Sequence, residues 1–430
     1  MNAAPRGVRL HIGIFGRRNV GKSSLLNALT RQQVSIVSPE PGTTTDPVEK
    51  PMELLPLGPV LFIDTAGLDD VGALGAQRVE RTMKVLDRTE LAILVLAEEG
   101  LGSLEIGLLD AFEQRKIPVL PVLNKSDLAK PADATLDRLL HRGYKPVVAS
   151  AARGEGMAEI REGLVDLAPD EYLNAPTILS DLVPPGELAV LVIPVDKEAP
   201  KGRLILPQSR SIRDLLDHDA YALVVQEREL RSALDNLKRK PALVVTDSQA
   251  FLKVAADTPP DVPLTSFSIL FARQKGDLLQ FARGALAIDN LKPGDRIAIA
   301  EACSHHPVGE DIGRVKIPRW LGQYIGGSLD VQQVQGRDFI ADPKEFKLVI
   351  HCGSCMLNRR EVLSRIFSCN RAGVPITNYG MAIAYSLGIF ERALQPFPAA
   401  LDAYRQAVAA RGAKRMQPVA KAVVQVTPKN

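Results

Sequence analysis

A chain of 430 residues is too long for one ordinary core and indicates two to four domains. The formal net charge of +3 excludes a strong overall field for polyanions, so we expect no nucleic-acid partner. Four cysteines are too few for a disulfide framework, and the longest apolar runs, at 91–97 and 188–194, are far too short to span a membrane. Because the amino terminus also lacks a signal-like apolar segment, we expect a cytoplasmic protein with no membrane partner.

Residues 8–168 alternate short apolar segments with helical patterns. Strands are predicted at 8–16, 60–67, 90–97, 117–125 and 145–150, and helices at 22–30, 75–87, 103–115 and 133–143. This order predicts the α/β class, with a mostly parallel sheet covered by helices on both faces.

The second half continues the α/β rhythm beyond a proline-rich stretch at 174–187, which we interpret as a linker. Strands are predicted at 187–195, 221–226, 241–248, 295–303 and 346–352, and helices at 209–219 and 227–240. A second proline-rich break lies at 257–263. We therefore expect domains at 1–175, 183–260 and 264–400, followed by a helix end and tail at 401–430.

The segment GRRNVGKS at 16–23 fits the P-loop pattern, and it follows a predicted strand and opens a predicted helix. Its glycines let backbone N–H groups wrap phosphates, Lys22 is expected to reach the β- and γ-phosphates, and Ser23 is expected to bind Mg²⁺. The site residues predicted here are Gly16, Asn19, Val20, Gly21, Lys22, Ser23 and Ser24.

Two further short motifs suit the metal and the γ-phosphate. In DTAG (64–67), Asp64 can hold Mg²⁺ through water, and the Gly67 N–H can sense the γ-phosphate. In PGTTTD (41–46), Thr44 is the hydroxyl expected to complete the Mg²⁺ shell. Lys22, Thr44, Asp64, Gly67 and Asn19 are the predicted catalytic residues.

The segments NKSD (124–127) and SAA (150–152) each follow a predicted strand. Asp127 can accept hydrogen bonds from the N1–H and N2–H₂ groups that guanine has and adenine lacks. Asn124 is expected to tie this loop to the P-loop, and the Ala151 N–H to donate to guanine O6. The predicted base-binding residues are Asn124, Lys125, Asp127, Ser150 and Ala151, and the predicted ligands are GTP and GDP.

Leu68 follows DTAG where many GTPases carry a glutamine that orients water, so we expect slow intrinsic hydrolysis. The motifs GxxNxGKS, GTT and DTAGL resemble those of the Era- and MnmE-type GTPases. In several of those, an asparagine at the place of Asn19 helps to hold K⁺, and the resemblance therefore implies potassium stimulation.

A second set of chemically active residues lies near the carboxyl terminus, in CSHH (303–306) and HCGSC (351–355). Zinc could bind two to four of these N and S ligands, and an iron–sulfur cluster could take three thiolates and a different fourth ligand. Residue types alone do not distinguish zinc from iron. The alternative is that these are separate core and surface residues that bind no metal. The candidate metal ligands are Cys303, His305, Glu310, His351, Cys352 and Cys355.

Glu310 is included as an exchangeable carboxylate that would leave a coordination place open. Cys369 lies in a helical pattern with no histidine beside it and is expected to be a packed thiol.

The chain resembles the iron-only hydrogenase maturation GTPase family, HydF, in its GTPase motifs, in the Cys-x-His…His-Cys-x-x-Cys set and in four further segments. These segments are 196–208, 305–321, 347–361 and 375–385. The sequence departs from the family where Ser354 replaces a common glycine and in the spacing between His305 and His351, which is at the short end for the family.

The resemblance implies a Ras-like P-loop GTPase domain, a small α/β dimerisation domain and an α/β cluster-binding domain, in that order. It implies a 4Fe-4S cluster on Cys303, Cys352 and Cys355, and a homodimer. It also implies a scaffold that carries a diiron precursor, built by the radical SAM maturases HydE and HydG, to apo FeFe-hydrogenase.

Two other functions fit parts of the sequence. One is a ribosome- or RNA-associated Era/MnmE-like GTPase with a structural zinc site, although no stretch rich in basic and aromatic residues supports it. The other is a GTP-dependent assembly scaffold whose metal only stabilises a fold.

Overall fold

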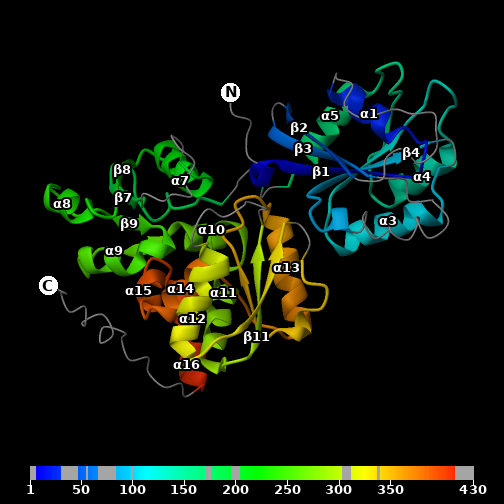
Figure 1. Ribbon diagram of the computed structural model, residues 1–430. Coiled ribbons are helices and arrows are strands. Elements are labelled where there is room, and N and C mark those ends of the chain that lie inside the picture. Colours follow the sequence, from blue (N-terminus) through cyan, green and yellow to red (C-terminus); the bar gives the residue numbers. More distant parts are fainter. Residues whose placement is uncertain are drawn as a thin grey trace, which may run out of the picture. The chain divides into compact units, whose positions relative to one another are not determined.

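The computed structural model describes residues 6–30, 47–54, 57–65, 84–97, 100–169, 172, 176–194, 204–302, 311–336 and 339–411. The chain forms two compact units, Met1–Pro176 and Thr177–Asn430, which are described separately (Figure 1). Several predicted residues lie outside the described part of the chain: Thr44, Gly67, Leu68, Cys303, His305 and Glu310. Most of the predicted helix at 75–87 and most of the predicted tail also lie outside it.

The first unit contains a six-stranded sheet in the order β2-β3-β1-β4-β5-β6. Its strands are β1 (Leu10–Phe15), β2 (Val48–Leu54), β3 (Gly58–Asp64), β4 (Leu91–Leu96), β5 (Val119–Leu123) and β6 (Val147–Val148). All neighbours are parallel except β2, which runs antiparallel to β3. The five predicted strands are confirmed, whereas β2 was not expected. Its Pro51 cannot donate to a ladder, and an edge position tolerates that loss.

Helices cover both faces of this sheet, as predicted (Figure 1). They are α1 (Lys22–Thr30), α3 (Ser103–Gln114), α4 (Asp133–His141) and α5 (Met157–Asp166). Apolar residues of α1 and α5 join one core cluster, and those of α3 and α4 join the cluster on the opposite face. Because β1, β3, β4, β5 and β6 are parallel, the loops that carry the nucleotide motifs meet at one edge.

The second unit contains two four-stranded parallel sheets, in the orders β10-β9-β7-β8 and β12-β11-β13-β14. The strands of the first are β7 (Leu188–Val192), β8 (Tyr221–Val225), β9 (Leu243–Thr246) and β10 (Leu264–Ser266). Those of the second are β11 (Arg296–Glu301), β12 (Asp330–Gln335), β13 (Leu348–His351) and β14 (Ile376–Asn378). The α/β class predicted for this half is confirmed.

The helices of the second unit are α7 (Leu206–Asp217), α8 (Leu230–Asp235), α9 (Phe251–Asp257), α10 (Phe267–Lys275), α11 (Leu278–Ala285), α12 (Ile317–Ile325), α13 (Arg359–Ala372), α14 (Tyr379–Ser386), α15 (Phe390–Leu394) and α16 (Pro398–Arg411). One continuous hydrophobic core joins residues of both sheets. No helix in the described part of the chain combines the length and apolar character needed to cross a bilayer.

The boundary between the two compact units, at Pro176, falls within the proline-rich stretch that we interpreted as a linker. The described residues beyond this boundary are packed on the second unit, which the interpretation did not include. Ile178, Leu179 and Val183 are buried in the core of the second unit. The backbone N–H groups of Ile178 and Leu179 donate to one oxygen of Asp214, on α7, at 3.1 and 2.9 Å. Apolar side chains and an acceptor for the backbone therefore attach this segment despite its prolines.

The expected boundary between the second and third domains also differs from the structure. Strand β10, which opens the range 264–400, pairs with β9 of the middle sheet. The proline-rich segment 257–263 is accordingly a loop between α9 and β10, with Val262 buried in the shared core.

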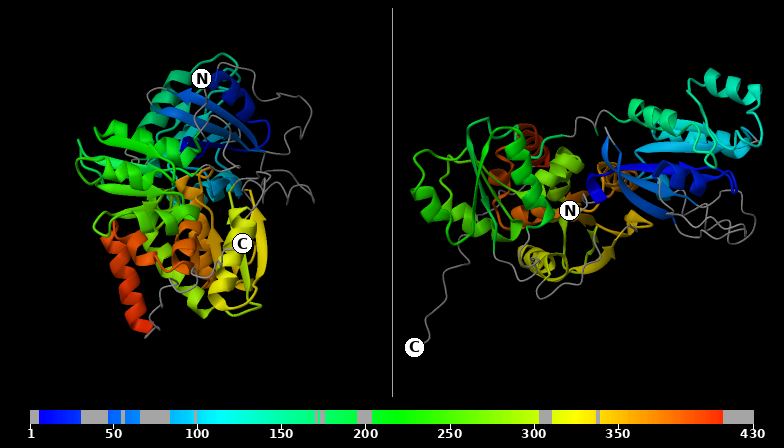
Figure 2. Two further views of the ribbon diagram at one scale, coloured as in Figure 1. Left: turned by 60° about the vertical axis from the view of Figure 1, so that its left-hand side comes forward. Right: turned by 90° about the horizontal axis from the view of Figure 1, so that it is seen from above.

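Helices α11 and α13 lie on opposite sides of the sheet that contains β11 (Figure 1). On the far side of α11 lies α16, the red helix in Figure 2. At Gly284 the helix α11 approaches β14 so closely that an added Cβ would collide with the carbonyl oxygen of Ile376. Backbone therefore packs directly on backbone at this point.

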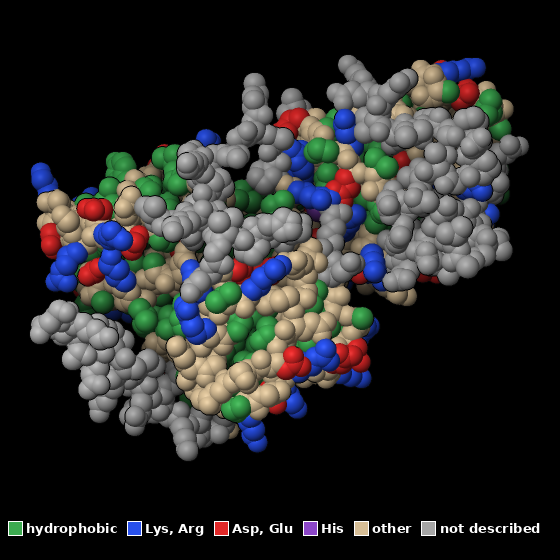
Figure 3. Space-filling view, viewed as in Figure 1, with side chains coloured by type: hydrophobic (Ala, Val, Ile, Leu, Met, Phe, Trp, Pro, Cys, Tyr) green, Lys and Arg blue, Asp and Glu red, His purple; other side chains and the backbone are tan. Residues whose placement is uncertain are grey.

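Basic and acidic side chains are interspersed over the visible face in Figure 3. This mixture agrees with the small formal charge of the whole chain.

Candidate nucleotide site and cysteine turn

The P-loop between β1 and α1 adopts a backbone that its glycines permit. Gly16 and Gly21 have φ of +146° and +92°, in the region that favours glycine. A Cβ at Gly16 would collide with the carbonyl oxygen of Val95, and one at Gly21 would collide with the side chain of Asn124. Asn19 also has a positive φ, +61°, which asparagine tolerates better than most residues. The two glycines thus allow the loop to pack against the strand ends beside it.

The predicted phosphate and metal ligands are brought together beneath this loop. Lys22 is buried, and its Nζ donates to the carbonyl oxygens of Gly16 and Arg17 at 2.9 and 2.6 Å. Ser23 Oγ donates to Asp64 Oδ2 at 2.6 Å. A hydroxyl and a carboxylate in contact at the start of α1 form the kind of oxygen pair that Mg²⁺ prefers.

The loop after β5 is joined to the P-loop by Asn124. Its Nδ2 donates to the carbonyl oxygen of Val20 at 2.9 Å, and its Oδ1 accepts from the Ala151 N–H at 3.0 Å. In this structure the Ala151 N–H, which we expected at guanine O6, therefore donates to Asn124. Ser150 Oγ donates to Asp127 Oδ1 at 2.6 Å, and this bond lowers the pKa of the half-buried Asp127 carboxyl. The carboxyl is thus held ionised, as acceptance of two donors from a base requires.

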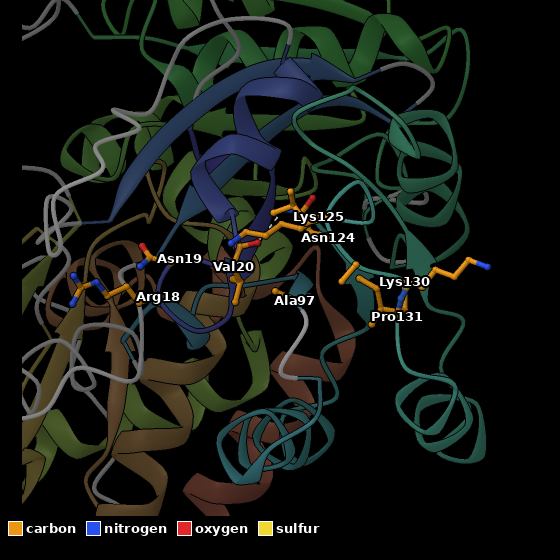
Figure 4. Close-up of a pocket in the computed structure, with 11 residues that line it drawn as sticks. Arg18, Asn19, Val20, Ala97, Asn124, Lys125, Lys130 and Pro131 are labelled. Carbon is orange, nitrogen blue, oxygen red and sulfur yellow. Dashed lines mark hydrogen bonds between the residues drawn. The ribbon is translucent and has the colours of Figure 1, made fainter.

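A cavity of about 410 Å³ opens between these two loops (Figure 4). Asn19 and Val20 line it from the P-loop, and Asn124 and Lys125 line it from the loop after β5. Leu128 also lines it, although its side chain is largely exposed. A volume of this size suits a small-molecule ligand.

The segment from Cys352 to Cys355, here called the cysteine turn, begins directly after β13. Cys352 Sγ accepts hydrogen bonds from the backbone N–H groups of Ala302, at 3.1 Å, and Ser354, at 3.5 Å. The parallel pairing of β11 with β13 brings Ala302, at the end of the described strand segment, to this sulfur. N–H donors aimed at a sulfur suit a thiolate ligand of an iron–sulfur cluster. Cys303 is the next residue after Ala302 in the sequence.

Burial opposes ionisation of both thiols in the described structure. It raises the pKa of Cys352 to about 11, and the two backbone donors only partly offset it. It also raises the pKa of Cys355, against the opposing effect of the Lys275 charge. A metal that binds thiolates would have to displace these protons.

His351, one of the candidate ligands, has hydrogen-bonding partners at both ring nitrogens in this structure. Its Nε2 accepts from Arg365 Nη1 at 3.0 Å, and its Nδ1 lies 3.0 Å from both the Cys352 carbonyl oxygen and Ser354 Oγ. Burial and the nearby Arg365 charge lower the pKa of His351 to about 3, so the ring is neutral. Because its ring bonds to Arg365, Ser354 and the Cys352 carbonyl oxygen, His351 stabilises the cysteine turn.

Ser354 has a φ of +57°, the left-handed conformation that glycine adopts most easily. This backbone gives a physical reason for the glycine that is common at this position in the family. Cys369 is fully buried in α13, which confirms the prediction of a packed thiol. In the described ranges, no three His, Cys, Asp or Glu side chains form a group able to hold a metal.

The second unit matches two family models of one protein family. Residues 178–276 match the hydrogen maturase F dimerization domain, and residues 279–396 match the hydrogen maturase F tetramerization domain. The chain belongs to the hydrogen maturase F (HydF) family. In this HydF chain, residues 11–125 match the model of the 50S ribosome-binding GTPase, so the first unit is a P-loop GTPase domain.

Curated relatives of the HydF chain resemble its first unit. The tRNA modification GTPase MnmE of Synechococcus sp. (strain JA-2-3B'a(2-13)) is 38% identical over 173 residues, which are 38% of this chain and 36% of that protein. The GTPase Der of Campylobacter jejuni (strain RM1221) is 38% identical over 154 residues, 33% of each chain. The chain therefore spans about a third of the length of these relatives.

Solved structures of GTPases were also matched. The G domain of the T. maritima FeoB iron transporter is 27% identical, with a TM-score of 0.30, and the match covers 37% of this chain and 99% of that one. Aquifex aeolicus Era bound to GDP and AlF4⁻ is 21% identical, with a TM-score of 0.34, and the match covers 58% and 99%.

Proposed function

We propose that this HydF-family protein binds and hydrolyses GTP and serves as a carrier in the maturation of FeFe-hydrogenase. The observation that carries the proposal is the match of two successive HydF models to the second unit, behind a GTPase domain. The arrangement of Lys22, Ser23 and Asp64 beneath the P-loop supports binding of the nucleotide phosphates with Mg²⁺. Thr44 and Gly67 complete the proposed Mg²⁺ and γ-phosphate contacts.

We further propose that the second unit holds a 4Fe-4S cluster on Cys303, Cys352 and Cys355, with Glu310 as an exchangeable fourth ligand. The N–H donors at Cys352 and the position of Ala302 beside it support this proposal. A cluster with three thiolates keeps one iron open to a further ligand, which suits a site that binds a diiron precursor reversibly. His305 remains a candidate ligand, whereas His351 takes a supporting role.

The cargo and its partners follow from the family. HydE and HydG would build the diiron precursor, and this protein, as a homodimer, would deliver it to apo FeFe-hydrogenase. GTP and GDP contact the switch segments differently, so their exchange can bias an interface with these partners. Equal partner affinity of the GTP- and GDP-bound protein would contradict this role of the nucleotide.

Hydrolysis is proposed to be slow and stimulated by potassium. Leu68 cannot orient water, and Asn19 lies in the P-loop beside the cavity. The rate of phosphate release should be higher in KCl than in NaCl of equal concentration. Equal rates would overturn the potassium proposal without affecting GTP binding.

The decisive experiment uses anaerobically purified protein. About four irons per chain with matching sulfide would support the cluster, whereas a colourless protein with one zinc would favour an RNA-associated GTPase with a structural site. The protein loaded with a diiron precursor should then activate apo-hydrogenase. Cys303→Ala, Cys352→Ala and Cys355→Ala should each abolish activation, and Cys369→Ala should leave it unchanged.

A further inference from the structure

Lys275, the last residue of α10, lies beneath the cysteine turn. Only 4% of the surface of this residue is exposed. Its Nζ donates to the carbonyl oxygens of Ser354, Cys355 and Leu357, at 3.0, 3.2 and 2.6 Å. The three acceptors follow one another closely in the chain, so one ammonium group fixes the path of the turn on the side of Cys355.

A second basic residue connects the same two segments, 274–276 and 354–359, and we call their contact the joint. Arg359, at the start of α13, donates through Nη1 to the carbonyl oxygens of Gln274 and Gly276, at 2.9 and 3.1 Å. Each segment therefore supplies a cation to the backbone carbonyls of the other.

The joint connects the two family-matched regions of the second unit. Lys275 lies at the end of the dimerization-domain match, and the turn that it holds lies in the tetramerization-domain match. Helix α10 also packs on α7 of the middle sheet and on α13 and α14 of the other. A change in the packing of the middle sheet would therefore reach the cysteine turn through this helix.

The charge of Lys275 has a chemical consequence beyond its hydrogen bonds. A buried cation stabilises nearby negative charge more strongly than an exposed one, because solvent screens it less. The Lys275 ammonium lies 3.2 Å from the backbone carbonyl oxygen of Cys355, one of the proposed cluster ligands. Reduction adds an electron to an iron–sulfur cluster, and local charge is one of the factors that set its potential.

We propose that Lys275 is a positioning residue of the cluster site, which fixes the turn between Cys352 and Cys355 and favours the reduced state of the cluster. This inference rests on the proposed cluster function. It assigns to a residue of the middle domain the task of holding and tuning a site in the next domain.

The test compares Lys275→Met and Lys275→Gln with wild type after anaerobic reconstitution of the full chain. Glutamine keeps an N–H donor and so protects the fold, while both variants remove the charge. The reduction midpoint of the cluster, followed by EPR during a potentiometric titration, should shift to more negative values in both. Loss of iron to a chelator should become about tenfold faster in Lys275→Met, as is usual when a supporting contact of a metal ligand is removed.

Two matched controls separate this role from simple stabilisation. Arg359→Met weakens the same joint but leaves the bonds from Lys275, and Lys253→Met removes an exposed lysine from α9. Both should keep the wild-type midpoint. An unchanged midpoint in both Lys275 variants would overturn the inference, as would an equal shift in Arg359→Met. A wild-type protein that binds no iron would instead overturn the proposed function itself.

Discussion

Asp127 is the residue on which discrimination between guanine and other bases is expected to depend. Ser150 donates to one oxygen of its carboxylate and lowers its pKa, which fixes an ionised acceptor in the loop after β5. Asp127→Asn should weaken GDP binding about 100-fold or more, because hydrogen bonds to a charged acceptor contribute about 1.5–3 kcal/mol each. Calorimetry with GDP measures the loss. Asp133→Asn, at an exposed position, serves as the control. If both variants bind GDP with equal affinity, guanine does not contact Asp127.

Ser354 combines a strained backbone with two side-chain contacts, and substitutions can separate them. Its Oγ lies 3.0 Å from His351 Nδ1 and donates to the Cys352 carbonyl oxygen at 3.2 Å. Ser354→Ala keeps the left-handed backbone and loses these contacts, so it should destabilise the second unit by about 1 kcal/mol. Ser354→Gly should be close to neutral, because relief of a penalty of about 1 kcal/mol offsets the same loss. Chemical unfolding compares the two variants, and a less stable glycine variant would contradict this account.

At the scale of elements, an ion pair attaches the P-loop to the start of α3. Arg17 donates through Nε and Nη2 to the two oxygens of Glu105, at 2.7 and 3.0 Å, and the Gly102 N–H donates to the same carboxylate at 2.9 Å. Burial raises the pKa of Glu105, but the hydrogen bonds and the Arg17 charge outweigh it, so the pKa lies below 4.5. Glu105→Gln should lower the stability of the GTPase domain by about 1–2 kcal/mol at neutral pH.

The pH dependence of this effect has a definite sign. Because the folded pKa is depressed, the ionised carboxylate stabilises the fold above pH 4.5, and this stabilisation is lost as the pH falls through the folded value. The difference in melting temperature between wild type and Glu105→Gln should therefore shrink below pH 4.5. A difference that stays constant into that range would show that the charge of Glu105 does not matter.

The edge strand β8 is the element that we expect to form the proposed homodimer. It ends the order of the middle sheet, and its Tyr221 and Val224 are 62% and 44% exposed. Hydrophobic side chains gather over the region of β8 and α7 in Figure 3. An exposed apolar edge invites pairing with another chain, and this region matches a dimerization model.

Tyr221→Lys or Val224→Lys should therefore weaken the dimer about tenfold or more, since lysine on an edge strand opposes pairing. Sedimentation analysis over a range of concentrations measures the effect. Val148→Lys, on the edge strand β6 of the other unit, is the matched control and should leave the dimer intact. The same dissociation constant in all variants would exclude β8 as the interface.

For the whole molecule, the nucleotide and cysteine sites belong to separate compact units. Cys352→Ala and Cys355→Ala should therefore abolish iron binding and leave the affinity for GDP within about twofold of wild type, because no residue of the nucleotide site is touched. Iron analysis and fluorescence titration with a labelled nucleotide measure both quantities on the same sample. A large parallel loss of nucleotide affinity would contradict the independence of the two sites.

The sequence predicted those parts of the fold that depend on local pattern. Strands β1, β4 and β5 of the first sheet were predicted correctly because their apolar runs are buried throughout, and α1 has the bounds that were expected. Strand β12, with the sequence DVQQVQ, is polar and lies at an edge, so no apolar run announced it. The proline-rich segment around Ile178 was interpreted as a linker, and the boundary between the two units does fall there. The burial of its apolar residues was not predicted, because the prolines were given more weight than the apolar residues between them.

The site shows the same division between local and distant information. The glycines and ligands of the P-loop follow from a contiguous motif, and the structure brings Ser23 to Asp64. Lys275, Arg365 and Glu105 escaped notice because each contacts residues far away in the sequence. The role of His351 depends on Arg365, and neither residue type nor spacing could have revealed that partner.

The close approach at Gly284 has a consequence for how the second unit can vary. A single methyl group there would act as a wedge between α11 and β14, because the backbone of Ile376 leaves it no room. Helix α16 rests on α11, so the displacement would pass outward to the last described helix. The absence of a side chain at Gly284 thus sets the distance between α11 and β14. Substitutions elsewhere in α11 must preserve this distance.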